Sequence, residues 1–117
     1  QEILESYRSS LSVDKNLKLN FIQENCENGA WMPTLLVEGK SNSAAEILEA
    51  DLRKSGIDAR PVFKPLTSLP MFEDNETNVN SLRFSQKAIN LPSFHTMSKL
   101  QLDFIIDSVF KILRTLD

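Results

Sequence analysis

Apolar residues recur along the chain at spacings that predict helices and short strands in alternation. The first eleven residues, QEILESYRSSL, carry four apolar residues on one helical face: Ile3, Leu4, Tyr7 and Leu11. In residues 17–22, LKLNFI, the apolar residues instead alternate with polar ones: Leu17, Leu19 and Phe21. Alternation is the pattern of a strand with one buried face, so a helix followed by a strand is expected here.

A polar stretch, ENCENGA, separates this strand from the next. Its Asn28-Gly29 pair is of the type that adopts the positive φ angles of a tight turn. A second strand is predicted from Trp31 to Val37. Pro33 is expected near the start of that strand, because proline has no amide hydrogen to donate to a neighbouring strand.

Residues 43–55 have the features of a second helix. Ser43 with Glu46 three residues later forms a capping-box pattern, and Leu48 and Leu52 predict a buried stripe. Gly56 follows where a left-handed residue would end the helix. A third strand is predicted over ARPVF, residues 59–63.

The last third of the chain predicts a helix, a strand and a longer helix. NVNSLRFSQK is a short helix with Asn78 as its cap, AINL is a strand, and Pro92 ends that strand. Ser98 and Gln101 form a capping box for the final helix. The apolar face of this helix has five residues: Leu102, Ile106, Val109, Leu113 and Leu116.

The predicted order is therefore α, β, β, α, β, α, β, α. Short connections between the strands predict an α+β fold with a small antiparallel or mixed sheet of three to four strands and helices packed on one face. The length of 117 residues, with 41% hydrophobic and 25% charged residues, is that of one soluble globular domain.

Composition excludes several classes of partner. The net charge is −3 and the cations are scattered, so the basic stripe of a nucleic-acid-binding protein is missing. No apolar run approaches the roughly 18 residues of a membrane span, and no signal-peptide pattern opens the chain, which predicts a cytoplasmic protein. One cysteine, Cys26, and one histidine, His95, are too few for a zinc site.

The chain contains no residue pattern of a catalytic centre. It lacks a glycine-rich phosphate loop, a nucleophile elbow and a paired-histidine motif. His95 lies in a predicted loop, where a solvated histidine is the more common case. The acidic residues fall mainly on the exposed faces of the predicted helices, so no catalytic residue is expected in this chain.

The segment IDARPVFKPLTSLPMFE, residues 57–73, is the best candidate for a binding site. Pro61 and Pro65 stiffen the backbone beside Arg60 and Lys64, and a guanidinium held in this way suits a carboxylate or a phosphate. Thr67 and Ser68 add hydroxyl groups. We therefore predict substrate binding by Arg60, Lys64, Thr67 and Ser68; in the alternative interpretation, Arg60 pairs with a surface acid and the prolines only rigidify a connection.

Several motifs in order along the chain resemble the C-terminal small domain of the DegT/DnrJ/StrS sugar aminotransferases. They are Gly56-Ile57, Ala59-Arg60-Pro61, Phe63-Lys64-Pro65, Pro70-Met71-Phe72, Ile89-Asn90-Leu91-Pro92-Ser93 and the helix from Ser98. The sequence departs from the family where Leu66-Thr67-Ser68-Leu69-Pro70 replaces the frequent Met-His-Leu-Gln-Pro. A substrate role for that histidine therefore does not transfer to this chain.

The resemblance implies that residues 1–117 are the small domain of a pyridoxal-phosphate enzyme of the aspartate-aminotransferase fold type. The large domain, which carries the Schiff-base lysine, would precede residue 1, so no cofactor is expected on this chain alone. The whole enzyme would be a homodimer that moves an amino group from an amino acid, usually glutamate, to a nucleotide-linked keto sugar or a cyclitol.

Two other classes of function remain open from the residues. One is a stand-alone α+β module that binds a small anion or has a regulatory role, and the other is an interaction domain that dimerises through a helix face. The small-domain interpretation predicts an exposed apolar patch where the large domain would pack. The stripe of Ile3, Leu4 and Tyr7 is its candidate.

Overall fold

The computed structural model describes residues 1–73 and 77–116, and within them it has the predicted order of elements. The helices are α1 (Glu2–Leu11), α2 (Ala44–Lys54), α3 (Val79–Lys87) and α4 (Lys99–Arg114), with a 3-10 turn, η1, at Leu66–Ser68. The strands are β1 (Leu17–Leu19), β2 (Thr34–Val37), β3 (Arg60–Pro61) and β4 (Ala88–Asn90). These elements confirm the α+β prediction.

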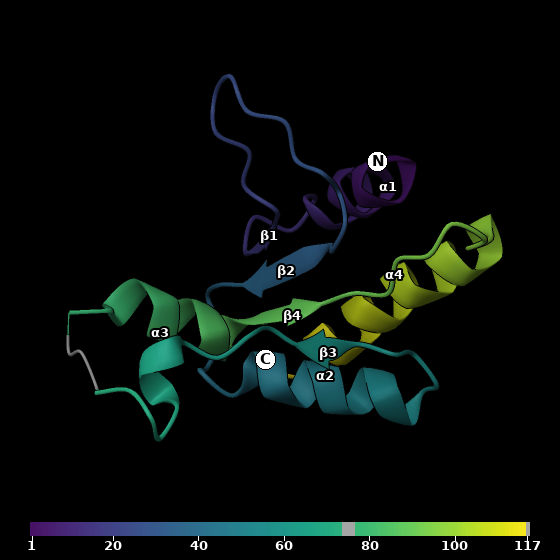
Figure 1. Cartoon of the computed structure of the whole chain (residues 1–117). Coiled ribbons are helices and arrows are strands. Elements are labelled where there is room, and N and C mark those ends of the chain that lie inside the picture. Colours follow the sequence, from purple (N-terminus) through teal and green to yellow (C-terminus); the bar gives the residue numbers. More distant parts are fainter. Residues whose placement is uncertain (74–76, 117) are drawn as a thin grey trace.

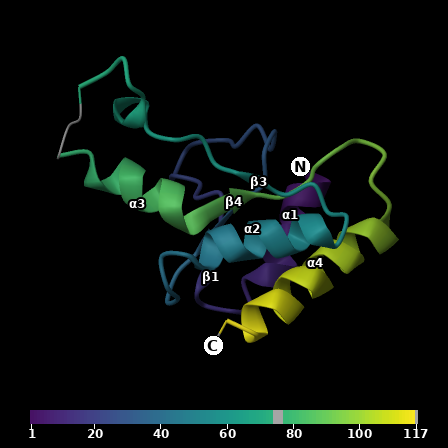
Figure 2. The same ribbon diagram turned by 90° about the horizontal axis from the view of Figure 1, so that it is seen from below.

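The strands form one antiparallel sheet in the order β1-β2-β4-β3 (Figure 1). Leu35 of β2 lies opposite Leu19 of β1 on one side and opposite Ile89 of β4 on the other. These three side chains are buried in the core with those of α1, α2 and α4. One face of the sheet therefore packs on the helices, as predicted, and α3 leads directly into the first residue of β4 (Figure 2).

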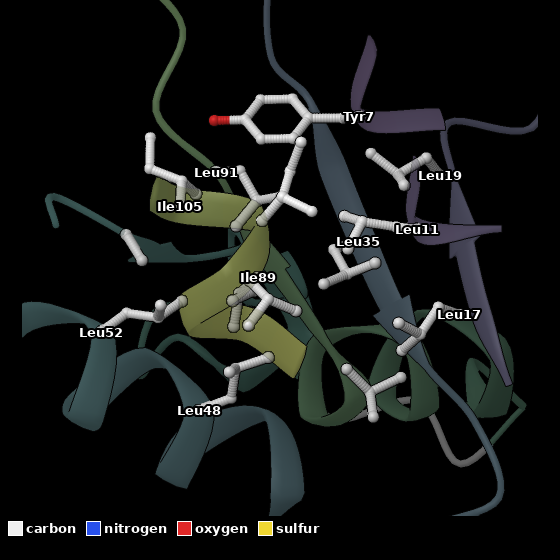
Figure 3. Packing of buried hydrophobic residues seen from close by; sticks show 14 of the residues in the cluster. Tyr7, Leu11, Leu17, Leu19, Leu35, Leu48, Leu52, Ile89, Leu91 and Ile105 are labelled. Carbon is white, nitrogen blue, oxygen red and sulfur yellow. The ribbon is translucent and has the colours of Figure 1, made fainter. Parts of the chain in front are cut away.

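The core is centred on side chains that are almost completely buried (Figure 3): Tyr7, Leu11, Leu35, Leu48, Leu52 and Ile89. Tyr7 is the one polar side chain among them, and its hydroxyl donates a hydrogen bond of 3.0 Å to the carbonyl of Pro92. Burial raises the pKa of Tyr7 far above its ordinary value, so the phenol stays neutral. This bond ties α1 to the chain immediately after β4.

Helix α2 ends as predicted but does not begin as predicted. Gly56 has a φ of 79°, the Ile57 amide donates to the Leu52 carbonyl at 3.0 Å, and the Gly56 amide donates to the Arg53 carbonyl at 3.0 Å, which is a Schellman motif. The prediction of a capping box at Ser43 is wrong. Ser43 has helical angles, φ −86° and ψ −5°, so its hydroxyl accepts no capping hydrogen bond.

The final helix carries the capping box that its sequence predicts. The Ser98 hydroxyl accepts from the Gln101 amide at 3.2 Å, and the Gln101 side chain accepts from the Ser98 amide at 2.9 Å. Its predicted apolar face is buried except for Leu116, which is half-buried against the core. Asn78 does precede α3, but its side chain makes no capping hydrogen bond, so that cap was predicted wrongly.

The first two strands are shorter than predicted because Asn20 interrupts the extended backbone. Asn20 has a φ of 24°, and its side chain donates to the Met32 carbonyl at 2.9 Å and accepts from the Thr34 amide at 2.7 Å. The prediction that Phe21 is buried in a strand is wrong, since it is 91% exposed. Trp31 is also exposed and lies outside β2, whereas Pro33 directly precedes β2, as expected.

The segment between β1 and β2 rises from the sheet as a long loop (Figure 1). The positive φ angles in it belong to Asn20, Asn25 and Ala30, not to the predicted Asn28-Gly29 pair. The Asn28 side chain instead accepts a hydrogen bond of 2.7 Å from the Ala30 amide. This local bond organises the turn in place of the tight turn predicted at Asn28-Gly29.

A second projection leaves the sheet after β3, and we call residues 62–73 and 77–87 the arm. It holds η1 and α3, and none of the α3 residues is buried. Arg83 of α3 contacts Glu38 at 3.3 Å, and Glu38 also pairs with Lys18 at 2.6 Å. The hydrogen bond from Lys18, with the charges of Lys18, Arg83 and Lys87, lowers the pKa of Glu38. These ion pairs link α3 to β1 through Glu38, the residue that follows β2.

Candidate functional site

An open groove of about 430 Å³ lies where β3, β4 and the end of the 20–33 loop meet. Six side chains that bear on its chemistry line this groove: Trp31, Asp58, Arg60, Asn90, Pro92 and Phe94. Trp31 is 76% exposed and Phe94 is 43% exposed, so both aromatic rings remain accessible to a ligand. The groove therefore offers aromatic surface beside an amide, a guanidinium and a carboxylate.

A row of three polar residues crosses the sheet, and two of them, Asn90 and Arg60, line the groove. Thr34 of β2 lies opposite Asn90 of β4, and Asn90 lies opposite Arg60 of β3. Because side chains alternate along a strand, and Leu35 and Ile89 face the helices, these three residues lie on the other face of the sheet. Strand pairing thus brings together residues from three distant segments of the sequence.

Asn90 connects the three strands of this row. It is only 8% exposed, its side-chain oxygen accepts from the Thr34 hydroxyl at 2.8 Å, and its amide nitrogen donates to the Pro61 carbonyl at 3.4 Å. A buried amide without such partners would carry a desolvation penalty. Asn90 therefore fixes the short edge strand that carries Arg60.

Arg60 is oriented by the acid two residues before it. Ile57 and Ala59 are buried, so Asp58 and Arg60 both project outward. The Arg60 Nη2 donates to Asp58 Oδ2 at 2.8 Å, and Nε lies 3.3 Å from each carboxylate oxygen. This hydrogen bond lowers the pKa of Asp58 and raises the pKa of Arg60. The pair is exposed, at 72% for Arg60 and 66% for Asp58.

The structure places only one of the four predicted binding residues in the groove. Arg60 lines it, whereas Lys64 is exposed on the segment that leaves β3, and Thr67 and Ser68 lie in η1. The Ser68 hydroxyl donates to the Pro65 carbonyl at 2.7 Å, which is a local turn contact. Substrate binding by these four residues stays a prediction, and the Asp58 contact is the surface pairing of the alternative interpretation.

Sequence reasoning missed the remaining polar groups of the groove. Asn90 is the one polar residue of the apolar run AINL, and an amide in a buried strand is a signal that it holds a neighbouring element. Asp58 alternates with buried residues in GIDAR, which places it beside Arg60. Trp31 and Phe94 carry no such signal, because they reach the groove from loops.

The other candidates from the sequence lie outside this groove. His95 is exposed in the loop between β4 and α4, and Cys26 is an exposed free thiol. Among residues 1–73 and 77–116, no three His, Cys, Asp or Glu side chains are grouped so that they could hold a metal ion. No helix in the same residues has the length and apolar character to cross a membrane.

Replacement of Asn90 by alanine should lower the free energy of unfolding by about 1–3 kcal/mol, because the Thr34 hydroxyl and the Pro61 carbonyl lose their partner. Urea denaturation measures this loss. Thr34→Val is the matched control, since it removes the same bond from the other side. The double variant should lose less unfolding free energy than the sum of the losses in the two single variants, because both remove the same hydrogen bond. A loss equal to that sum would show that Thr34 and Asn90 are not coupled.

Comparison with known proteins places the chain in a family. The family model described as the DegT/DnrJ/EryC1/StrS aminotransferase family matches residues 1–110. A comparison with curated protein sequences found no significant match.

Solved structures share the fold across almost the whole chain. Spr1654 from Streptococcus pneumoniae, described as a sugar aminotransferase, aligns in its PMP form with a TM-score of 0.88 and 21% identity over 99% of this chain and 30% of its own. The aminotransferase TlmJ from Streptoalloteichus hindustanus aligns with a TM-score of 0.86 and 17% identity, over 99% of this chain and 31% of its own. PseC from Helicobacter pylori is an aminotransferase involved in the biosynthesis of pseudoaminic acid. It aligns with a TM-score of 0.82 and 16% identity, over 97% of this chain and 32% of its own. The chain thus spans about 30% of the length of Spr1654.

Proposed function

Because the chain belongs to the DegT/DnrJ/EryC1/StrS aminotransferase family, we propose that residues 1–117 form the C-terminal small domain of a pyridoxal-phosphate-dependent sugar aminotransferase. The observation that carries this proposal is the family match, which runs over residues 1–110. The proposed reaction moves an amino group from an amino acid, glutamate, to a keto sugar linked to a nucleotide. The enzyme is proposed to act in the cytoplasm as a homodimer.

The cofactor is proposed to be held by a large domain that precedes residue 1. A Schiff-base lysine is activated by a desolvated pocket or by a neighbouring cation, and no lysine among the described residues 1–73 and 77–116 is buried. The residues present therefore do not fit a pyridoxal-phosphate site. In the whole enzyme the cofactor would supply the electron sink for transamination.

The proposed contribution of this chain is to bind the anionic part of a substrate. Arg60 lines an open groove together with Asn90 and the exposed Trp31. A guanidinium binds a carboxylate or a phosphate through parallel hydrogen bonds. Lys64, Thr67 and Ser68 follow Arg60 along the arm, where they are proposed to contact the same extended substrate.

The proposal is tested by incubating the 117-residue chain with pyridoxal phosphate and reducing the mixture with borohydride. We expect weak, substoichiometric labelling spread over surface lysines and no transaminase activity, because each lysine is exposed or half-exposed. Mass spectrometry of the peptides gives the labelled positions. A stoichiometric adduct on one specific lysine would contradict the assignment of the catalytic centre to a separate domain.

The arm carries the apolar surface that a missing partner would cover. Seven of its large apolar side chains are exposed: Phe63, Leu66, Met71, Phe72, Val79, Leu82 and Phe84. The predicted patch on α1 is wrong, because Leu4 and Tyr7 are 4% and 0% exposed and belong to the core of this chain. Exposed apolar clusters of this kind mark interaction surfaces.

We therefore expect the 117-residue chain to associate as its concentration rises, which sedimentation velocity measures. Replacing Phe63 and Met71, 79% and 72% exposed, by serine should weaken this association. Leu100→Ser is the matched control, because Leu100 is 82% exposed on α4, outside the arm, and should have little effect. A strict monomer at high protein concentration would remove the support that the arm gives to the missing-domain proposal.

A further inference from the structure

We infer that Asp58 acts through Arg60. Its carboxylate competes with the anionic group of the substrate for the Arg60 guanidinium and so limits the affinity of the groove for that anion. This inference rests on the proposed function, because it assigns Arg60 to anion binding. It goes further by giving a role to a carboxylate that carries the same charge as the proposed ligand and lines the same groove.

The contact geometry places Asp58 on the edge of Arg60 that a bidentate anion would use. A bidentate ligand uses two neighbouring N–H groups of a guanidinium. In Arg60, Nε lies 3.3 Å from both carboxylate oxygens of Asp58, and Nη2 lies 2.8 Å from Asp58 Oδ2. The carboxylate thus occupies the position in which the carboxylate or phosphate of a substrate would bind. An incoming anion must displace Asp58 or bind the remaining edge beside a negative charge.

The backbone keeps both partners in place for this contact. Asp58 follows the Schellman turn of Gly56 and Ile57, and the burial of Ile57 and Ala59 directs Asp58 outward. The register with β4 fixes Arg60 opposite Asn90, which also holds the Pro61 carbonyl. The Asp58 carboxylate is therefore a local competitor that accompanies Arg60 whether or not a ligand is present.

The pair is weak enough for a ligand to displace. Both side chains are largely exposed, at 72% and 66%, and exposed ion pairs contribute little. An anion that reaches Arg60 in the groove also meets the Asn90 edge and the aromatic rings of Trp31 and Phe94. We infer that these extra contacts select a ligand of the right shape, while Asp58 keeps Arg60 from holding small anions tightly.

The test is an NMR titration of the 117-residue chain with inorganic pyrophosphate, followed through the Arg60 Nε–H resonance. Asp58→Asn should tighten pyrophosphate binding by about 1.5- to 5-fold, which is the factor that corresponds to an exposed ion pair. Asp58→Glu keeps the negative charge and should give no gain. In an Arg60→Ala background, followed through the Asn90 side-chain amide resonance, Asp58→Asn should have no effect, because the competition acts only through Arg60.

The same variants in the enzyme that contains this chain give a second readout, which does not depend on the isolated chain. Asp58→Asn should lower KM for the anionic substrate by a similar factor without raising kcat. Weaker pyrophosphate binding or a raised KM in Asp58→Asn, together with a loss in Arg60→Ala, would overturn the role of Asp58 and leave the proposed function intact. No response of the Arg60 resonance and no effect of Arg60→Ala would overturn both the role of Asp58 and the anion-binding role proposed for Arg60. The assignment to a small domain is tested separately by the pyridoxal-phosphate labelling.

Discussion

Replacement of Arg60 by alanine is expected to lower kcat/KM of the proposed aminotransferase by about 10- to 100-fold, since a hydrogen-bonded contact to a charged group contributes about 1.5–3 kcal/mol. The loss should appear mainly for one substrate. It falls on the amino donor if Arg60 binds a carboxylate, and on the sugar if Arg60 binds a diphosphate. Steady-state kinetics with both substrates varied measures this difference.

Two further variants separate binding geometry from charge. Arg60→Lys should rescue little, because an ammonium group cannot reproduce the planar pair of donors. Lys64→Ala should cost less and the loss should decrease with salt, since Lys64 is exposed on the arm and acts as a screened point charge. If Arg60→Ala keeps normal efficiency for both substrates and loses only thermal stability, Arg60 is a surface partner of Asp58 and nothing more.

Replacement of Leu48 by alanine should lower the free energy of unfolding by about 2–5 kcal/mol, the usual loss when a buried leucine leaves a cavity. Leu48 is 0% exposed and packs from α2 into the core near Ile89 of β4 (Figure 3). A loss of this size removes a large part of the stability of a small domain. Urea denaturation, with the midpoint and the slope both fitted, gives the value.

Ile47→Ala is the matched control in the same helix. Ile47 is 38% exposed and precedes Leu48, so truncation there should cost much less while changing helix propensity in the same direction. Equal losses of unfolding free energy at the two positions would contradict the packing of the Leu48 side of α2 against the sheet. The comparison therefore tests the packing of the layer that supports β4 and its Asn90.

Elements defined by local interactions could be predicted from the sequence. The capping box of Ser98 and Gln101 depends on residues three apart, and Gly56 ends α2 because it tolerates a positive φ. The Ser43 box failed for a physical reason: the preceding turn holds Ser43 in a helical conformation. A cap requires an extended backbone, which residue types alone do not specify.

Strand ends were predicted poorly because non-local contacts decide them. The amide of Asn20 bonds across to Met32 and Thr34, and this contact ends β1 although Phe21 continues the alternating pattern. β3 has only two of the five residues predicted, and Pro61 offers no amide hydrogen to a partner strand. A pattern of apolar residues does not contain these competing hydrogen bonds.

The site was only half predictable for a related reason. Arg60 was found because two prolines mark its segment, and Asp58 lies close enough in sequence to have been inferred from alternation. Asn90 reaches Arg60 only because the sheet order places β4 beside β3, and Trp31 arrives from a loop. Strand order is a property of the whole fold, so residues joined by it stay separate in the sequence.

A crystal structure of the proposed aminotransferase that contains this chain, with an amino donor or a keto-sugar analogue bound, tests the central claim most directly. The account predicts a carboxylate or phosphate oxygen of the ligand within hydrogen-bond distance of the Arg60 guanidinium, with Asp58 displaced and the ligand in contact with Trp31 or Asn90. A ligand bound elsewhere, with Arg60 still paired to Asp58 and its groove open to solvent, would contradict it.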